Sequence, residues 1–304
     1  MTRANPRVNV VLPIYNAQKH LRAAVDSILA QTFSDFELIA INDGSTDASL
    51  SILQQYAKTD KRVWIVTRPN TGLVGALIDG LQAAQADLIA RMDGDDIALP
   101  TRIEKQVAYM DSHPDCVLLG TLVRSIDPHG LTLWEEHSTP TTHDELDAEL
   151  LKGRGGVIRH PTAMIRRAAI GKVGSYRPAF NCAEDLDLFL RLAEVGRIAN
   201  LPEILLEYRQ HYGSINRTKY EIQNQRATNS VYEAAARRGI TLPPGWKYQP
   251  DPPRPKVQQL RDWGWLALKS KRADIARKHA WSLLGLSPFN LESWRLMVCA
   301  LRGY

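Results

Sequence analysis

The stretch Asp87-Leu-Ile-Ala-Arg-Met-Asp-Gly-Asp-Asp96 joins a short apolar run to three carboxylates, Asp93, Asp95 and Asp96. An apolar run followed by polar residues predicts a buried strand whose C-terminal end reaches a site. Because like charges a few ångströms apart repel, such a cluster needs a cation beside it. A hard divalent metal, which prefers oxygen ligands, would meet that need. A solvated acidic turn that closes a strand is the alternative that this stretch alone leaves open.

Three earlier segments repeat the pattern of an apolar run followed by a polar turn. Strands are expected at 8–12, 36–41 and 63–66, and apolar residues at helical spacing follow each of them. This alternation predicts an α/β fold with a mostly parallel, doubly wound sheet, in which ligands bind beyond the carboxyl ends of the strands. The chain has no glycine-rich dinucleotide fingerprint after its first strand and no P-loop, so neither of those classes is supported.

The rest of the chain predicts a small antiparallel part and a separate helical end. Two runs flank Asp127-Pro-His-Gly130 and indicate a β-hairpin. We expect one domain over residues 1–217, a helix and a proline-rich linker over 218–256, and a C-terminal helical appendage over 257–304. The linker contains six prolines between residues 243 and 255.

Charge and composition suggest a cytoplasmic protein that contacts a membrane surface. No apolar run is long enough to span a bilayer, and the three cysteines lie far apart, as in a reducing compartment. Residues 254–304 contain ten Lys or Arg and three Asp or Glu. This basic segment favours peripheral contact with the inner face of the plasma membrane, although a solvated helical surface would have the same composition. No nucleic acid is expected as a partner.

Six motifs that follow one another along the chain carry a family resemblance. They are Val10-Val-Leu-Pro-Ile-Tyr-Asn16, Ile41-Asn-Asp-Gly-Ser-Thr-Asp47, Asn70-Thr-Gly72, Asp93-Gly-Asp-Asp96, Ala183-Glu-Asp-Leu-Asp-Leu-Phe-Leu-Arg191 and Tyr208-Arg-Gln-His211. Over roughly residues 7 to 217 the chain resembles the family 2 glycosyltransferases, which have the GT-A fold.

The resemblance implies an inverting transferase that uses a nucleoside-diphosphate sugar, usually a UDP-sugar, together with Mn²⁺ or Mg²⁺. It implies a metal site at Asp95 and His211. The expected nucleotide-sugar site comprises Pro13, Tyr15 and Asn16 along the nucleotide pocket, Asp43 on the base with Ser45 beside it, Asn70, Gly72 and Arg91 bordering base and diphosphate, and Asp93 near the ribose.

Asp185 is the candidate general base, because a single-displacement attack by a sugar hydroxyl needs a carboxylate within hydrogen-bond reach. It is expected near a helix N-terminus, whose dipole favours the ionised form; a plain helix cap is the alternative. Glu184 would orient the acceptor or hold the neighbouring backbone. His160 would touch the acceptor or only precede a rigid proline turn, and Arg154 would close over the diphosphate or meet an anionic acceptor.

The predicted function is transfer of a hexose to a saccharide or lipid-linked acceptor in the synthesis of a cell-envelope polysaccharide or glycolipid. A non-catalytic scaffold that binds sugar nucleotides and docks partners through the basic tail is one alternative. A sugar-nucleotide pyrophosphorylase is another, but it would need a glycine- and arginine-rich loop where this chain has Pro13-Ile-Tyr-Asn16.

Overall fold

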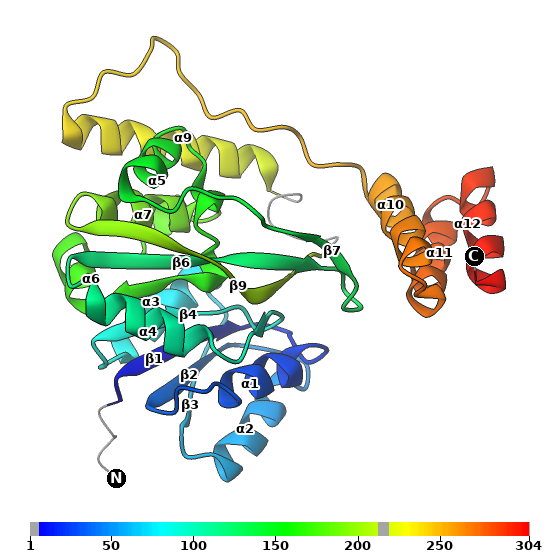
Figure 1. Ribbon diagram of the computed structural model, residues 1–304, viewed down its shortest axis with the longest axis horizontal. Helices are drawn as coiled ribbons and strands as arrows, with labels where there is room; N and C mark the ends of the chain where they lie inside the picture. The colour runs from blue at the N-terminus through cyan, green and yellow to red at the C-terminus, as the bar shows by residue number, and fades with distance from the viewer. Residues whose placement is uncertain (1–5, 212–218, 304) are drawn as a thin grey trace. The chain divides into compact units, whose positions relative to one another are not determined.

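The computed structural model describes residues 6–211 and 219–303 (Figure 1). Contacts between residues group the chain into two units. Unit 1 comprises Met1–Val123, Glu136–Tyr208 and Glu221–Gln249, and unit 2 comprises Arg124–Glu135, Arg209–Tyr220 and Pro250–Tyr304. The expected boundaries at residues 217 and 256 stay a prediction. The contacts assign the tip of the hairpin to the same unit as the C-terminal helices.

One mixed sheet contains the nine strands found in residues 6–211 and 219–303. The parallel strands are β1 (Val8–Ile14), β2 (Phe36–Asp43), β3 (Val63–Arg68) and β4 (Leu88–Arg91). The antiparallel part comprises β5 (Ile97–Ala98), β6 (Cys116–Ile126), β7 (Thr132–Glu135), β8 (Met164–Arg166) and β9 (Arg197–Arg209). The order is β3-β2-β1-β4-β8-β6-β9-β5, with β7 paired to β6. The predicted α/β class and the hairpin are confirmed.

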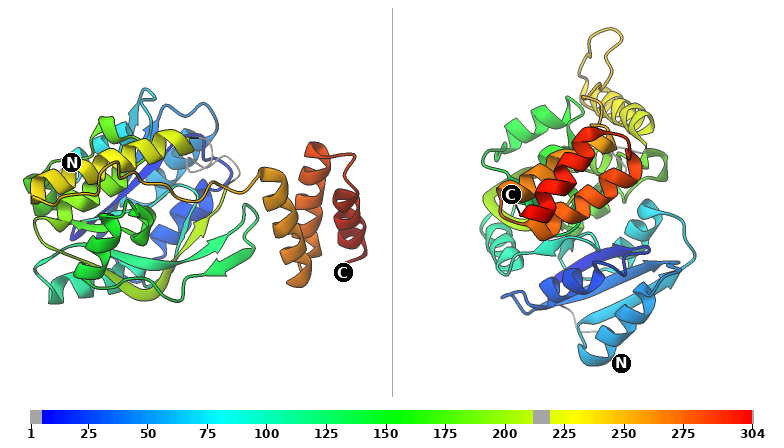
Figure 2. Two further views of the ribbon diagram at one scale, coloured as in Figure 1. Left: turned by 90° about the horizontal axis from the view of Figure 1, so that it is seen from above. Right: turned by 90° about the vertical axis from the view of Figure 1, so that its right-hand side faces the viewer.

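Helices connect the strands and form the C-terminal part. In unit 1 they are α1 (Leu21–Leu29), α2 (Ser49–Thr59), α3 (Leu73–Ala83), α4 (Arg102–Ser112), α5 (His143–Leu150), α6 (Arg167–Val173), α7 (Glu184–Ala193) and α9 (Tyr220–Arg238), with short 3₁₀ turns η1 (Gly155–Val157), η2 (His160–Thr162) and η3 (Pro178–Phe180). In unit 2, α10 (Lys256–Lys269), α11 (Ala273–Leu286) and α12 (Leu291–Arg302) lie side by side (Figure 2). Within the described ranges, no helix is both long and apolar enough to cross a bilayer.

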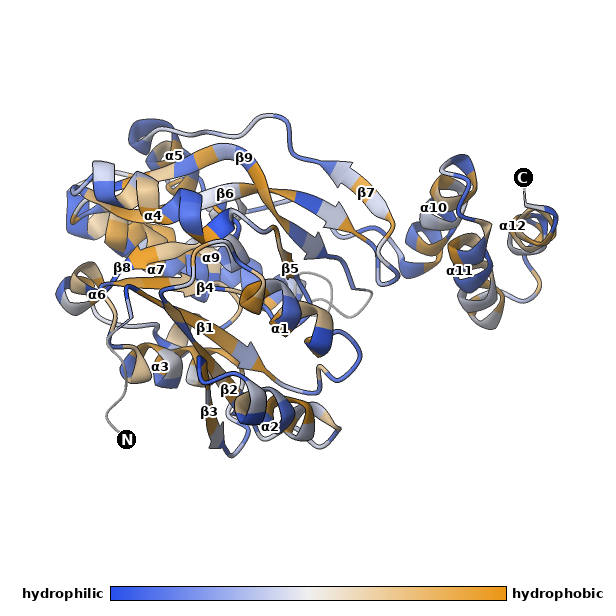
Figure 3. Ribbon diagram, turned by 60° about the horizontal axis from the view of Figure 1, so that its bottom comes forward, coloured by the Kyte–Doolittle hydropathy of each residue, from blue (hydrophilic) through white to orange (hydrophobic). Residues whose placement is uncertain are grey.

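Side chains of the central strands point alternately to the two faces of the sheet, and each face has its own hydrophobic core. Val10 and Leu12 of β1 belong to the core that includes α1, α2 and α4, whereas Val11 belongs to the core that includes α3, α7 and α9. Because successive side chains of a strand point to opposite faces, a strand covered on both faces is apolar along most of its length. Figure 3 shows this hydrophobic colouring on β1 and β4. Both faces of the sheet are therefore covered, and its polar strand ends are the place left for a ligand.

Unit 2 is held together by a buried polar contact as well as by an apolar core. His279 of α11 lies with its Nε2 2.5 Å from Oδ2 of Asp127, in the turn between β6 and β7. The backbone amides of His129 and Leu131 donate to Oδ1 of Asp127 at 2.7 and 2.8 Å. Burial would raise the pKa of Asp127, but these hydrogen bonds outweigh it and lower the pKa. The hairpin tip and α11 are thus one structural piece.

Candidate active site

The turns after β1 and β2 are joined by hydrogen bonds between predicted site residues. Asn16, whose φ is 50°, accepts a hydrogen bond at Oδ1 from the Thr46 amide at 2.8 Å. Its own amide donates to Oγ of Ser45 at 3.1 Å. Pro13 is buried within β1, whereas the Tyr15 ring is 53% exposed. The structure therefore brings Asn16 and Ser45 together and leaves Tyr15 accessible to a ligand.

Asp43 fixes the turn after β3. The backbone amides of Thr71 and Gly72 donate to its Oδ1 and Oδ2 at 3.1 and 2.9 Å. Arg68 Nε lies 3.2 Å from Oδ1, and the carboxylate is buried. Gly44 allows this approach, because its φ is +68° and an added Cβ would lie 2.7 Å from the Asn70 amide nitrogen. The predicted residues Asp43, Asn70 and Gly72 thus meet at one place.

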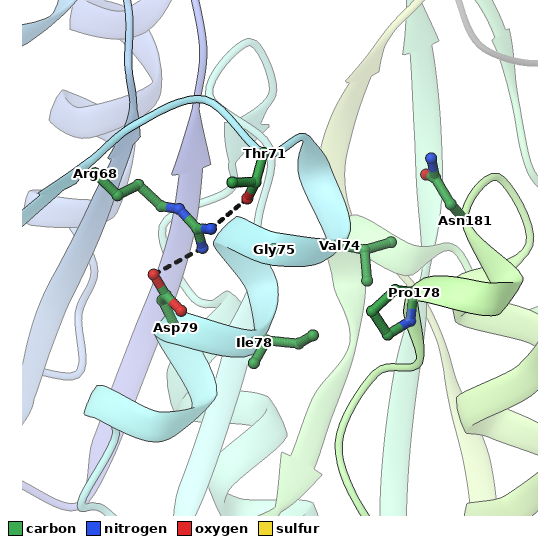
Figure 4. A pocket seen from close by; sticks show the side chains of 8 residues that line it. All are labelled: Arg68, Thr71, Val74, Gly75, Ile78, Asp79, Pro178 and Asn181. Carbon is green, nitrogen blue, oxygen red and sulfur yellow. Dashed lines mark hydrogen bonds and ion pairs between the residues drawn. The ribbon is translucent and has the colours of Figure 1, made fainter.

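A pocket of about 370 Å³ lies along α3 (Figure 4). Arg68, which the sequence did not single out, borders it and also pairs with Asp79 at 2.7 Å and with Thr71. The lining is Arg68, Thr71, Val74, Gly75, Ile78, Asp79, Pro178 and Asn181. Two residues in this wall, Arg68 and Thr71, contact Asp43 directly, so the pocket adjoins the predicted base-binding carboxylate.

The three carboxylates after β4 form a cluster. One ligand oxygen from each of Asp93, Asp95 and Asp96 lies within 4.8 Å of the others. Arg91 contacts both oxygens of Asp93, with Nη1 2.8 Å from Oδ2 and Nη2 2.6 Å from Oδ1. Carboxylate oxygens at this separation suit a hard divalent cation. The donor set therefore fits the metal that the sequence predicts.

Two buried arginines lie beneath this cluster. Arg102 donates from Nη2 to the carbonyl oxygen of Arg91 at 2.7 Å and from Nε to Gln106 at 3.2 Å. Burial lowers the pKa of Arg102 to about 9, while the nearby Asp96 raises it, so the guanidinium stays charged at neutral pH. Arg91 thus pairs with Asp93, and Arg102 holds the backbone of Arg91 in place. Arg102 was not predicted, because its sequence position resembles an ordinary first helical turn.

Asp185 and Glu184 occupy the first turn of α7. Oδ1 of Asp185 accepts from the Leu186 amide at 2.8 Å, and Oε2 of Glu184 accepts from the Cys182 amide at 2.8 Å. Burial is the largest influence on both groups and raises the pKa of Asp185, against the expected effect of the helix dipole. Burial and the Asp185 charge together raise the pKa of Glu184 to about 7. The base role of Asp185 stays a prediction.

Arg91 links the strand end to α7 electrostatically. It pairs with Asp93, and its positive charge lowers the pKa values of both Glu184 and Asp185 against the effect of burial. Burial is the larger cause of the lowered pKa of His160, and the Arg91 charge lowers it further. The charge of Arg91 therefore acts on carboxylates of both β4 and α7.

His160 is buried in η2, and its Nε2 lies 2.8 Å from the hydroxyl of Tyr176. With a pKa well below the ordinary value, the ring is neutral, and burial raises the pKa of Tyr176 as well. This arrangement favours a structural role for His160 over contact with an acceptor. Tyr176 itself was not predicted, because a lone tyrosine in a loop carries no signal in sequence.

The glycine-rich loop before η1 lies against the predicted base. A Cβ added at Gly155 would be 3.0 Å from Cβ of Leu186 and 3.7 Å from Oδ2 of Asp185. Arg154 is exposed and pairs with Glu149 at 2.6 Å. The absence of a side chain at Gly155 lets the backbone approach the carboxylate closely.

His211 follows β9 and belongs to unit 2. Its role as a metal ligand stays a prediction.

Residues 9–174, more than half of the chain, match the family profile described as glycosyl transferase family 2. This chain belongs to that family. The match spans β1 to α6 and ends before Asp185. The glycosyltransferase is 36% identical over 241 residues to the O-antigen biosynthesis glycosyltransferase WbnJ of Escherichia coli, covering 77% of this chain and 91% of the relative. The predicted family and enzyme class are confirmed.

Two solved structures share the fold of this glycosyltransferase. Staphylococcus aureus TarS residues 1–349, in complex with UDP-GlcNAc, align with a TM-score of 0.62 at 16% identity, over 97% of this chain and 79% of TarS. The mannosyltransferase PcManGT of Pyrobaculum calidifontis, in complex with GDP-Man and Mn²⁺, aligns with a TM-score of 0.55 at 17% identity, over 99% and 81% of the two chains. These likenesses confirm the predicted GT-A fold.

Proposed function

We propose that this glycosyltransferase moves a sugar, with inversion, from a nucleoside-diphosphate donor to an acceptor hydroxyl, with Asp185 as general base. The observation that carries the proposal is the position of buried Arg91, which pairs with Asp93 of the β4 cluster and whose charge also lowers the pKa values of Glu184 and Asp185 in α7. One group suits a metal-bound diphosphate, and the other can accept a proton. A transfer reaction of this kind needs both functions close to one reacting carbon.

The donor is proposed to be a UDP-sugar. The exposed Tyr15 ring can stack on the base, and Asp43 can accept a hydrogen bond from a base N–H, since each carboxylate oxygen has a second lone pair. Ser45, Asn70 and Gly72 lie beside Asp43 in the joined turns. The likeness in fold to TarS, which was solved with UDP-GlcNAc, supports a uridine nucleotide.

A divalent cation, Mn²⁺ or Mg²⁺, is proposed to be held by Asp95 in the β4 cluster. When bound, it would neutralise the charge that develops on the diphosphate leaving group. The close grouping of three carboxylates after β4 supports this assignment, as does the fold likeness to a mannosyltransferase solved with Mn²⁺. Asp93, already paired with Arg91, is assigned to the ribose.

The chemical step is a single displacement. The acceptor oxygen forms a bond to the anomeric carbon while the bond from that carbon to the diphosphate oxygen breaks, and the diphosphate leaves with the electron pair. The acceptor proton passes to Asp185, which must therefore be ionised. The pKa of Glu184 is raised to about 7, so its protonated form can donate a hydrogen bond. It would orient the acceptor or hold the neighbouring backbone at Cys182.

The acceptor is proposed to be a saccharide or a lipid-linked saccharide, and the reaction to take place in the cytoplasm at the membrane face. The O-antigen biosynthesis role in the name of the Escherichia coli relative supports a cell-envelope product. The basic residues 254–304 support peripheral contact with an anionic membrane.

The test begins with a panel of nucleotide sugars, each assayed with Mn²⁺ for thermal stabilisation and for release of the nucleotide. With the donor that responds, Asp185→Asn should lower turnover about 10²–10⁴-fold and leave donor affinity near that of the wild type. Asp144→Asn, in the exposed first turn of α5, is the matched control and should be silent. Full turnover by Asp185→Asn would overturn the base assignment. Donor binding by the wild type without any transfer would favour the scaffold alternative.

A further inference from the structure

Helix α12 of unit 2 has apolar side chains on two faces. Leu296, Met297 and Ala300 are buried in the core that α12 shares with α10 and α11. The second set faces solvent and comprises Leu291 (85% exposed), Trp294 (53%), Val298 (43%) and Leu301 (63%). Spacings of three, four and three residues place all four side chains on one side of the helix. This stripe is therefore a continuous surface, separate from the face that stabilises the fold.

The turn between α11 and α12 extends the stripe. Phe289 in this turn is 98% exposed, and the Trp294 indole Nε1 donates to the carbonyl oxygen of Pro288 at 2.7 Å. The hydrogen bond satisfies the polar atom of the indole and holds its ring beside the turn. We name Phe289, Leu291, Trp294, Val298 and Leu301 the apolar ridge. Exposed ridges of this kind mark interaction surfaces.

Positive charge flanks the apolar ridge. At 100° per residue, Arg295 and Arg302 fall next to Leu291 and Val298 on the same side of α12, and both are exposed. Over residues 254–304 the ten Lys or Arg exceed the three Asp or Glu. A second copy of this surface would have the same sign of charge and would be repelled. An anionic surface would be attracted.

We propose that the apolar ridge is the element that docks this protein onto an anionic lipid bilayer. Phe289, Leu291 and Trp294 enter the boundary between headgroups and acyl chains, while Arg295 and Arg302 contact lipid phosphates, as in interfacial amphipathic helices. This inference rests on the proposed function, which places the reaction at the membrane face, and it specifies which residues make the membrane contact. Within the basic residues 254–304, the membrane contact is assigned to the five side chains of the apolar ridge and to two arginines.

The experiment is co-sedimentation of the full-length protein with vesicles of phosphatidylglycerol and phosphatidylcholine at low salt. We expect wild-type protein to pellet with these vesicles and to stay in solution with pure phosphatidylcholine. Phe289→Ser together with Leu291→Ser should weaken partitioning about tenfold, because interfacial binding scales with buried apolar area. Both side chains are almost fully exposed, so the fold should tolerate the change. Ile222→Ser, an exposed site on α9, is the matched control.

The Arg295→Gln and Arg302→Gln pair tests the charge contribution and should weaken binding to the anionic vesicles only. Wild-type pelleting that survives the Ser substitutions, or no pelleting at all, would overturn the proposal. So would a concentration-dependent increase in mass by light scattering that the Ser variant abolishes, because the ridge would then join copies of the chain. Nucleotide release from the donor, measured without vesicles, should be unchanged in the Ser variant. Failure of that reaction in the wild type would refute the transferase proposal while leaving the vesicle result intact.

Discussion

The strand ends of β2 and β4 both carry aspartates, but the two are neutralised in different ways. At the end of β2, the single carboxylate of Asp43 receives two backbone N–H groups and lies beside Arg68. At the end of β4, three carboxylates lie together above two buried arginines. The first carboxylate is held by backbone amides and an arginine, whereas the second group brings three carboxylate oxygens close enough to bind one metal ion.

The comparison separates Asp43, which can recognise a base, from the aspartates after β4, which can bind a cation. A carboxylate that is held by backbone amides is fixed in direction, so it can serve as a rigid hydrogen-bond acceptor for a base. A cluster with excess negative charge is destabilised until a cation arrives. The same residue type therefore performs two tasks at two neighbouring strand ends.

The largest expected effect is that of Asp95→Asn. Turnover should fall about 10²–10³-fold, because charge on the leaving group loses its stabilisation. The metal-free variant should also have a higher thermal midpoint than the wild type, since one of three like charges is gone. Steady-state assays and calorimetry in chelator measure the two effects, and Asp35→Asn on the surface is the control. If Asp95→Asn had a lower thermal midpoint in chelator than the wild type, repulsion among the three carboxylates would not be destabilising the protein.

Asp43→Asn should lower the free energy of unfolding, whereas Asp95→Asn should raise the stability of the metal-free protein. The amide has only one acceptor oxygen, so one partly buried N–H loses its partner and Arg68 loses its ion pair with Asp43, at a cost of about 1–3 kcal/mol. Urea denaturation of metal-free protein measures the loss, again against Asp35→Asn. Equal stability of the Asp43→Asn variant and the wild type would contradict the view that this carboxylate is structurally satisfied.

The pH profile of transfer should distinguish the two α7 carboxylates. Asp185 works only when ionised, so activity should fall as the pH drops through its raised pKa. Glu184, whose pKa is raised to about 7, loses its proton as the pH rises past that value, which removes its donor and adds a like charge beside Asp185. Activity of the wild type should therefore decline several-fold above neutral pH. Glu184→Gln mimics the neutral form and should keep the acid limb but lose the decline. A decline that persists in this variant would assign it to another group.

The smallest expected effect is that of Gly155→Ala. The new Cβ would lie 3.0 Å from Leu186 Cβ, so the loop or α7 must shift by a few tenths of an ångström beside Asp185. We expect about a threefold to tenfold loss of kcat, because misplacing a catalytic group by 1 Å can cost about 10²-fold. Gly156→Ala is the matched control, since its Cβ would meet only Arg159 Nη1 at 3.4 Å. Equal turnover of the two variants would show that Gly155 does not position the base.

The sequence alone predicts those features that depend on residues close to one another along the chain. Apolar runs, helical spacing and polar turns are local, so β1 to β4, their turns and α7 can be located from the order of the residues. The order of the motifs is enough to indicate family 2. The meeting of Asn16 with Ser45, and of Asp43 with Gly72, follows from the rule that parallel strands present their carboxyl ends together.

The tertiary structure alone decides the state of the charges. Arg68 and Arg102 are ordinary arginines in sequence, and only the fold places Arg68 beside Asp43 and buries Arg102 under the backbone of Arg91. The pKa of Glu184 depends on burial and on Asp185 within the packed site, and the helix dipole expected to dominate at Asp185 is outweighed by burial. The apolar ridge of α12 likewise exists only because the other face of the helix packs into the core of unit 2. Charge and exposure depend on residues far apart in the chain, because electrostatics and packing act through space.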